Sequence, residues 1–234
     1  MGDERKSLQG AQEKKQLSLS QLQRLRKAFP LDRPLTRLLL KFDNMLWEYR
    51  LGINSRGESF STAESDSIPY STIPYRMIMK ILRHLALEPS DVFVDIGCGK
   101  GRVLCCASRF RIRQVVGVEI DQDLCRAARH NTERVRGRQS PVSITHAAAQ
   151  ECDYRAGTVY YLFCPFGAAT LNQVLARIRQ SLQGEPRRIR IVYVNPMAEP
   201  LLERSGWLQM KDRWQMGNKF GLIHDVSFWQ AARA

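Results

Sequence analysis

The sequence lacks a hydrophobic run long enough to cross a membrane. The longest apolar stretch near the start, LTRLLLKF over residues 35–42, is too short and too charged to span a bilayer. Residues 1–16, MGDERKSLQGAQEKKQ, are charged and contain no apolar core, so they do not have the pattern of a secretory signal. These absences predict a soluble, cytoplasmic protein without a membrane span.

The sequence also lacks the cysteine patterns of metal sites. No CxxC pair occurs, and no group of cysteine and histidine has the spacing of zinc ligands, so we expect no metal. Several cysteines lie inside apolar runs, as small buried side chains do, which fits a reducing compartment. The six are Cys98, Cys105, Cys106, Cys125, Cys152 and Cys164.

Acidic residues are scarce. The 234 residues include 36 Lys and Arg but 23 Asp and Glu, for a formal net charge of +13. This balance favours an acidic macromolecular partner, such as nucleic acid, an acidic protein surface or anionic lipid. A solvated basic surface would have the same composition, and charge does not indicate the fold or the oligomeric state.

Strand and helix patterns alternate from residue 91 onward, and we expect strands separated by helices to form a parallel sheet. The predicted fold is therefore α/β, a doubly wound sheet with helices on both faces and an antiparallel hairpin at one edge. Ligands in such folds bind at the carboxyl ends of the strands. The predicted strands lie over residues 91–97, 113–120, 142–147, 158–166, 187–196, 207–214 and 222–231.

The residues before this pattern predict a separate extension. Apolar residues recur at helical spacing over 22–29 and again over 35–46, after two prolines. A loop rich in Gly and Ser follows over 52–67, and a further helix is predicted to begin near Pro74. We therefore predict a basic helical extension and loop over 1–67 and a domain over 68–234.

Three glycines follow the first predicted strand at every second position. In VFVDIGCGKGR, residues 92–102, Gly97, Gly99 and Gly101 fall where the strand turns into a helix. Glycine permits positive φ and has no Cβ to hold a ligand away, and a helix amino end presents free N–H groups. The segment predicts a ligand close to the backbone, although a tight turn would also use these glycines. The spacing is not the GxGxxG of dinucleotide sites, and no GK[ST] follows.

One acid ends the next predicted strand. Glu119, in VVGVEID, can accept two hydrogen bonds from a ribose diol, and Asp121 is predicted to cap the next helix. Nicotinamide enzymes use the same acid, so Glu119 alone indicates a nucleoside or a surface carboxylate. Together with the GxGxG spacing it favours S-adenosylmethionine, which has no pyrophosphate.

These motifs and the final hairpin resemble the class I S-adenosylmethionine-dependent methyltransferases over roughly residues 68–232. The resemblance implies a seven-stranded sheet of order 3-2-1-4-5-7-6 with S-adenosyl-L-methionine as cofactor. The alanines of ITHAAAQEC stand where many members carry an acid for adenine, so adenine recognition would depend on backbone, Gln150 or apolar contacts. The implied cofactor residues are Tyr70, Tyr75, Asp95, Gly97, Cys98, Gly99, Gly101, Glu119, Ile120 and Gln150.

The segment after the fourth predicted strand, YYLFCPFG, occupies the place where amino-directed methyltransferases carry [NDS]PP[YF]. A bacterial group of uncharacterised methyltransferases is more similar, because its GxGKGR and FNPF motifs match GCGKGR and FCPF. Cys164 replaces the Asn of that group, which removes an amide acceptor. Cys164, Pro165 and Phe166 are predicted to form the substrate side of the site, with Phe166 a pocket wall or a core residue. A nucleophilic Cys164 is not favoured, because no His or Lys accompanies it in sequence.

The sequence contains few signals that identify the methyl acceptor. The order YST…P, helix, FVDIG, VVGVEI resembles the non-SET histone-lysine methyltransferases, which implies a nitrogen of a protein side chain. Nucleic acid and small molecules stay open as acceptors, and so does a degenerate fold that serves as a scaffold. In-line methyl transfer requires the protein to align the methyl donor with the acceptor and to exclude water. We therefore do not expect a group of catalytic acid and base residues in the sequence.

Overall fold

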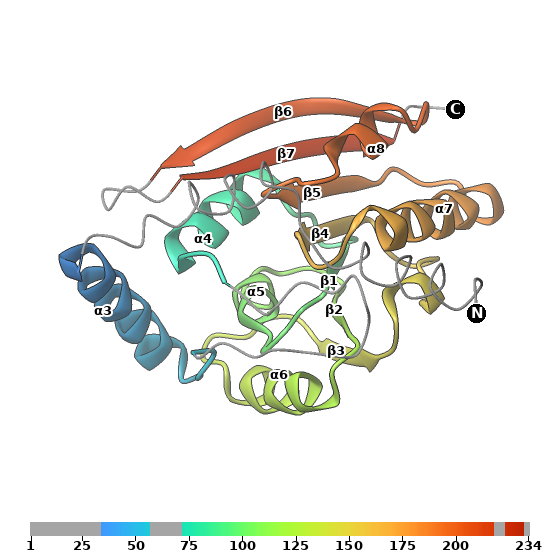
Figure 1. Cartoon of the computed structure of the whole chain (residues 1–234). Coiled ribbons are helices and arrows are strands. Elements are labelled where there is room, and N and C mark those ends of the chain that lie inside the picture. Colours follow the sequence, from blue (N-terminus) through green and yellow to red (C-terminus); the bar gives the residue numbers. More distant parts are fainter. Residues whose placement is uncertain (1–33, 57–71, 218–222, 232–234) are drawn as a thin grey trace, which may run out of the picture.

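The computed structural model describes residues 34–56, 72–217 and 223–231, which form one seven-stranded sheet (Figure 1). The strand order is β3-β2-β1-β4-β5-β7-β6, so the predicted order is confirmed. Strands β1 to β5 run parallel, and β7 pairs antiparallel with both β5 and β6. The strands are β1 (Val92–Ile96), β2 (Gln114–Glu119), β3 (Val142–His146), β4 (Val159–Phe163), β5 (Arg190–Val194), β6 (Leu208–Gly217) and β7 (Ile223–Ala231).

Helices cover both faces of this sheet, as predicted. Residues of α4, α5 and α6 join the hydrophobic core on one face, and residues of α7 and α8 join the core on the other. Within the described part of the chain, no helix is both long and apolar enough to cross a membrane. The helices are α3 (Pro34–Leu51), α4 (Tyr75–His84), α5 (Arg102–Ala107), α6 (Gln122–Arg134), the 3-10 turn η1 (Ala149–Glu151), α7 (Ala168–Gly184) and α8 (Glu199–Glu203).

The central strands contribute to both cores because their side chains alternate. Phe93 and Tyr161 face the core beneath α4 and α5, while Val94 and Tyr160 face the core beneath α7. All five residues of β1 are buried. Burial on both faces explains why these strands are almost continuously apolar in sequence.

Helix α3 lies beside the sheet domain and joins it through its last turn. Leu51 and Ile53 belong to the core, whereas Leu38, Phe42 and Tyr49 are exposed. The helix predicted over residues 22–29 and the predicted domain boundary at residue 67 lie outside the described residues. The division of the chain at that point stays a prediction.

Gly117 of β2 allows α5 to pack closely on the sheet, and its replacement by Ala is expected to lower stability. An added Cβ would lie 2.6 Å from Leu104 Cδ1 and 2.8 Å from Cys98 Sγ. Overpacking of this kind costs about 1–3 kcal/mol. Each kcal/mol lowers Tm by about 2–4 °C in a chain of this length. Thermal denaturation followed by circular dichroism measures the change.

The matched control is Gly184→Ala in α7, where an added Cβ meets nothing within 4 Å. We expect an unchanged or slightly higher Tm for this variant, because Ala restricts the unfolded chain. Equal losses in the two variants would show that the close packing over Gly117 does not limit stability.

Candidate active site

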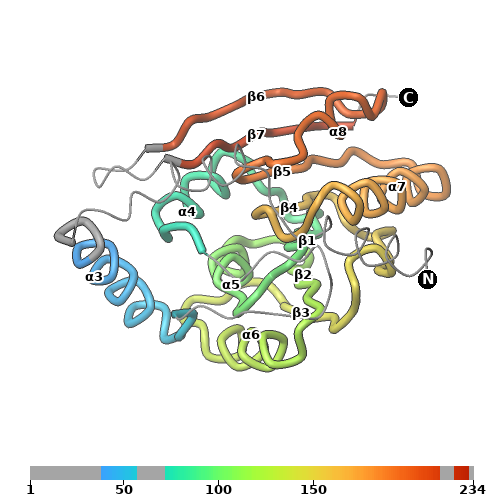
Figure 2. Tube along the Cα trace, viewed as in Figure 1, coloured from blue at the N-terminus to red at the C-terminus, as the bar shows by residue number. Residues whose placement is uncertain are grey.

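The glycine loop, residues 97–101, connects β1 to α5 at the carboxyl edge of the parallel strands (Figure 2). Gly97, Gly99 and Gly101 have φ values of 80°, 54° and 76°, which side chains with a Cβ rarely adopt. The N–H groups of Gly97 and Cys98 donate to Val118 O at 2.8 and 3.0 Å. These bonds join the glycine loop to the end of β2.

The glycine loop contacts the segment that follows β4. A Cβ on Gly97 would lie 2.4 Å from Pro165 Cβ, so the proline ring occupies the space that a side chain at position 97 would need. The structure therefore brings together the predicted cofactor loop and the predicted substrate-side segment. It also gives Gly97 a packing role in addition to any contact with a ligand.

The Glu119 carboxylate at the end of β2 is buried and holds the main chain around it. Its side chain Oε2 accepts from Gly99 N at 2.8 Å, and Oε1 accepts from Ile120 N at 2.9 Å and Asp121 N at 3.0 Å. Burial raises the pKa of Glu119, and these three N–H donors oppose the rise. A carboxylate has about four acceptor positions, so about one, on Oε2, is left for a ligand.

Asp95, in β1, places a second carboxyl group in the same region. Asp95 is buried, with a relative solvent-accessible area of 3%. Burial raises the pKa of Asp95 well above its usual value, and the neighbouring Glu119 carboxylate raises it further. A positively charged ligand beside these two groups would stabilise both in the ionised form.

Arg102 directly follows the glycine loop, and its buried guanidinium group fixes the loop to the segments before it. Nε donates to Ser55 Oγ at 2.8 Å, and Nη1 donates to Ile73 O at 3.2 Å. Nη2 lies 3.5 Å from Glu48 Oε1, and the guanidinium carbon lies 4.4 Å from the centre of the Tyr75 ring. Residues from α3 and α4 therefore surround the start of α5.

Asn131 of α6 supports the glycine loop from another direction. Its Nδ2 donates to Lys100 O and to Asn54 O, both at 2.9 Å, and its Oδ1 accepts from Asn54 N at 2.9 Å. Lys100 Nζ donates to Arg56 O at 2.6 Å. Residues 54–56 consequently lie along the glycine loop.

The ends of β4 and β5 carry strained backbone. Cys164 has φ 42° and Asn195 has φ 50°, although neither is glycine. Such conformations cost about 1–3 kcal/mol and concentrate at functional sites. Burial raises the pKa of the Cys164 thiol to about 11, so the thiol is neutral at pH 7. Phe166 is buried in the core that includes α7.

Sequence comparisons relate the chain to protein methyltransferases. Residues 58–151 match the model of the family described as histone methylation protein DOT1. A protein-lysine N-methyltransferase of Saccharolobus islandicus (strain REY15A) is 31% identical over 97 residues, which cover 41% of this chain and 60% of the relative. A ribosomal protein L11 methyltransferase of Burkholderia mallei (strain NCTC 10229) is 31% identical over 77 residues, covering 33% of this chain and 24% of the relative. The chain thus spans less than two thirds of these relatives.

Structural comparisons agree with this relation. An RNA methyltransferase from Salinibacter ruber in complex with S-adenosyl-L-homocysteine has a TM-score of 0.52 at 20% identity, covering 70% of this chain and 95% of that chain. A ribosomal protein L11 methylase from Lactobacillus delbrueckii subsp. bulgaricus has a TM-score of 0.53 at 13% identity, covering 70% and 81%. At these identities the likeness shows the fold. The chain has the fold of the class I S-adenosylmethionine-dependent methyltransferases.

The structure places the remaining predicted site residues in different surroundings. Gln150 lies half-buried in η1, and Ile120 O accepts a hydrogen bond from the His146 ring at 2.9 Å. Tyr75 is fully buried, with its hydroxyl 2.9 Å from Ser55 Oγ. Tyr70 lies outside the described residues. Contact of each of these residues with a cofactor stays a prediction.

Four residues that hold the glycine loop were missed by sequence reasoning. Glu48, Ser55, Arg102 and Asn131 are all buried and polar. Only Arg102 gave a local signal, because it follows GCGKG directly. Its partners lie in segments that meet only in the folded chain.

Asp95→Asn is expected to raise the stability of the ligand-free protein at neutral pH. A carboxyl group whose pKa is higher in the folded chain than in the unfolded chain binds more protons when folded. Wild-type stability therefore falls as pH rises from about 3.9 through the folded pKa. Asn cannot ionise, so the variant should lose this pH dependence and be more stable than the wild type at pH 7. Urea unfolding between pH 4 and pH 8 measures both effects, and a less stable Asn variant across this range would contradict the argument.

Arg102→Met is expected to destabilise the fold because Glu48 would lose its buried partner. Breaking a buried ion pair costs about 3–5 kcal/mol, and the low end is expected here because Arg56 Nε stays 2.7 Å from Glu48 Oε2. Adding Glu48→Gln should recover part of the loss. Arg111→Met, at an exposed position, is the control. Urea unfolding of the wild type, Arg102→Met, Glu48→Gln, the double variant and the control measures the coupling, and strictly additive losses would exclude a direct interaction.

Proposed function

We propose that the chain is an S-adenosylmethionine-dependent methyltransferase that acts on a nitrogen of a macromolecule, with a protein side chain as the favoured acceptor. The observation that carries this proposal is the pair of buried carboxyl groups, Asp95 and Glu119, beside the glycine loop. Burial disfavours ionisation of both. A ligand with an ammonium and a sulfonium group would offset that cost.

The residues at this edge fit such a cofactor. Asp95 is placed to attract the positively charged amino-acid part, and the free position on Glu119 Oε2 can accept a ribose hydroxyl. The glycine loop lets the backbone come close to the ligand without a Cβ in the way. When bound, the cofactor supplies a methyl group that is already activated by the sulfonium charge.

The protein's part in the transfer is to align the acceptor and to exclude water. The segment Cys164 to Phe166 is favoured for the acceptor side because Pro165 packs against Gly97. The Cys164 carbonyl oxygen is a candidate acceptor for an N–H of the substrate. The Cys164 thiol is not assigned a nucleophilic role, because burial keeps it protonated.

A protein acceptor is supported by the relatives. The matched family model concerns histone methylation, and the two curated relatives are named for protein lysine and for ribosomal protein L11. We further propose an acidic macromolecular partner, since the chain carries a net charge of +13. A cytoplasmic location fits the six cysteines, which are all unpaired thiols.

Cofactor binding is tested by titration calorimetry with S-adenosylmethionine. We expect the wild type to bind, and Glu119→Ala to bind about 1.5–3 kcal/mol more weakly, because it removes a charged hydrogen-bond acceptor. Glu133→Ala, at an exposed acid on α6, should leave the affinity unchanged. No binding by the wild type would favour a scaffold without catalysis.

The acceptor class is tested with cell extract and methyl-labelled cofactor. Samples treated in parallel with protease and with nuclease should lose the label only to protease. Asp95→Asn, which keeps the shape of the side chain, should transfer little label because the cofactor loses a carboxylate partner. Label removed by nuclease alone would exclude a protein acceptor.

A further inference from the structure

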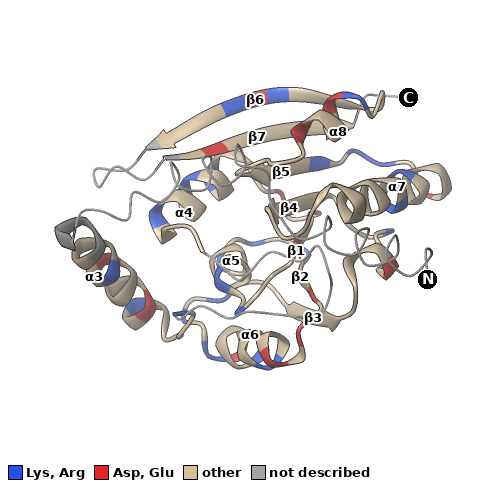
Figure 3. Cartoon of the chain, in the orientation of Figure 1, with Lys and Arg blue, Asp and Glu red and all other residues tan. Residues whose placement is uncertain are grey.

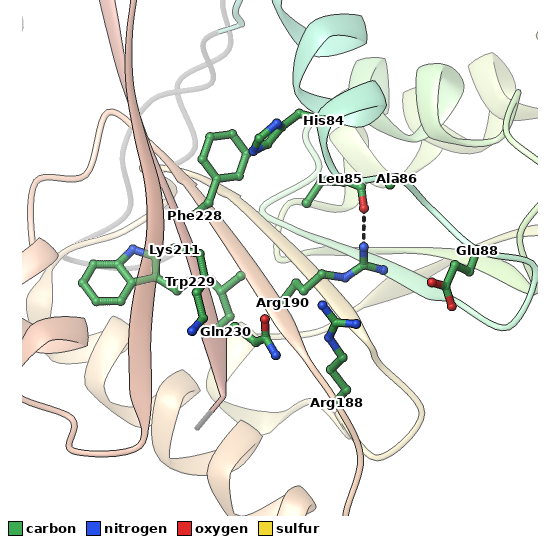
Figure 4. Close-up of a pocket in the computed structure, with 11 residues that line it drawn as sticks. His84, Leu85, Ala86, Glu88, Arg188, Arg190, Lys211, Phe228, Trp229 and Gln230 are labelled. Atoms are coloured by element: carbon green, nitrogen blue, oxygen red, sulfur yellow. Dashed lines mark hydrogen bonds between the residues drawn. The ribbon is translucent and has the colours of Figure 1, made fainter. Parts of the chain in front are cut away.

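A cavity of about 300 Å³ lies at the amino end of β5 (Figure 4). It opens between the turn after α4, the beginning of β5 and the β6–β7 hairpin. Because β1 and β5 run parallel, a site at the start of β5 is one strand length from the carboxyl edge. We call this cavity the basic pocket, and its main lining residues are Leu85, Arg188, Arg190, Lys211, Phe228 and Gln230.

Arg190 is fixed in place within the basic pocket. Its Nη2 lies 2.5 Å from Asp91 Oδ2, and its Nη1 donates to Leu85 O just beyond the end of α4. Burial raises the pKa of Asp91, but hydrogen bonds from Glu88 N–H, Arg190 and Thr158 outweigh it, and the pKa lies below its usual value. Asp91 is therefore ionised at neutral pH, and the Arg190 guanidinium is held in one position.

Two further cations in the basic pocket have no acidic partner. Arg188 has no hydrogen bond or ion pair to any described residue, and Lys211 Nζ donates to the neutral Gln209 Oε1 at 3.0 Å. Arg188 and Arg190 both line the pocket, and Figure 4 shows Glu88 on the side of the two arginines away from Lys211. The pocket thus presents positive charge that the described residues only partly balance.

The surroundings add to this charge. Lys and Arg residues occur on α4, on β6 and at the start of β5 (Figure 3). Arg76, Lys80 and Arg83 are exposed on α4, at spacings that place them on one side of the helix. Tyr75 at the start of α4 contacts Arg102 next to the glycine loop, and Leu85 just past its end lines the pocket. The basic side of α4 therefore runs from one edge of the sheet toward the other.

We propose that the basic pocket binds the carboxylate of an acidic side chain on the protein substrate, at a point remote from methyl transfer. This inference rests on the function proposed above. The Arg188 guanidinium, which has no partner among the described residues, can bind both oxygens of a carboxylate, and Lys211 adds a second cation to the same cavity. Leu85 and Phe228 supply apolar walls for the methylene groups of the same side chain. The cations converge on one cavity, which suits a single anionic group better than a continuous phosphate backbone.

The distance from the basic pocket to the carboxyl edge of the sheet predicts a spacing between two residues of the substrate. Strand β5 has five residues and spans about 16 Å. An extended peptide advances by about 3.3 Å per residue, so roughly five residues would separate the bound acid from the methylated side chain. The pocket would thereby select substrates with an acidic residue at that distance.

The test is fluorescence anisotropy of the full chain with fluorescein-labelled decaglutamate at 150 mM salt. Arg188→Glu/Lys211→Glu should weaken binding at least tenfold. The control Arg111→Glu/Arg134→Glu makes the same change in net charge at exposed positions outside the pocket and should stay within twofold. Arg188→Gln/Lys211→Gln, which removes charge without adding acid, should weaken binding several-fold and guards against misfolding.

Two results would overturn the inference. Equal weakening by the pocket variants and the control would mean that binding follows net charge alone. Binding of a labelled single-stranded RNA 12-mer through the pocket, without binding of decaglutamate, would assign the site to nucleic acid. Calorimetry with S-adenosylmethionine should give equal affinities for all variants. If the wild type did not bind S-adenosylmethionine, the proposed function would be refuted, and the decaglutamate result would be unaffected.

Discussion

The burial of two carboxyl groups at one edge of the sheet is the constraint around which the site is built. Asp95 is the penultimate residue of β1 and Glu119 is the last residue of the neighbouring parallel strand β2, and the Glu119 carboxylate is near enough to raise the pKa of Asp95. Glu119 is stabilised by three main-chain N–H groups, but Asp95 owes its raised pKa to burial and to Glu119 itself. The ligand-free protein therefore holds an unfavourable charge arrangement that a cationic ligand would relieve. Stability is given up where binding requires it.

A loop with three positive φ angles has few internal interactions of its own, so its shape is imposed by its surroundings. Val118 holds its first residues, Asn131 holds Lys100, and Arg102 anchors its end to Glu48 and Ser55. Part of this support comes from α3 and residues 54–56, which precede the predicted domain. Contacts from the sheet and from the segment before it therefore both determine the geometry of the glycine loop.

Local patterns and the family resemblance predicted most of the architecture. Asp121 was expected to cap α6, and its Oδ1 accepts from Asp123 N and Leu124 N at 2.8 and 3.0 Å. The strand order followed from the resemblance. The role of Arg102 could not be predicted, because its partners are distant in sequence and a buried arginine has no local pattern. Likewise, Arg188 and Lys211 line the same pocket only because β7 pairs with both β5 and β6.

The contact of Gly97 with Pro165 has a mechanical consequence. The proline ring occupies the volume that a side chain at position 97 would take, so neither segment can shift inward without moving the other. A substrate that displaced the segment after β4 would therefore also displace the glycine loop. The close packing of Pro165 against Gly97 thus couples the positions of the glycine loop and of the segment after β4.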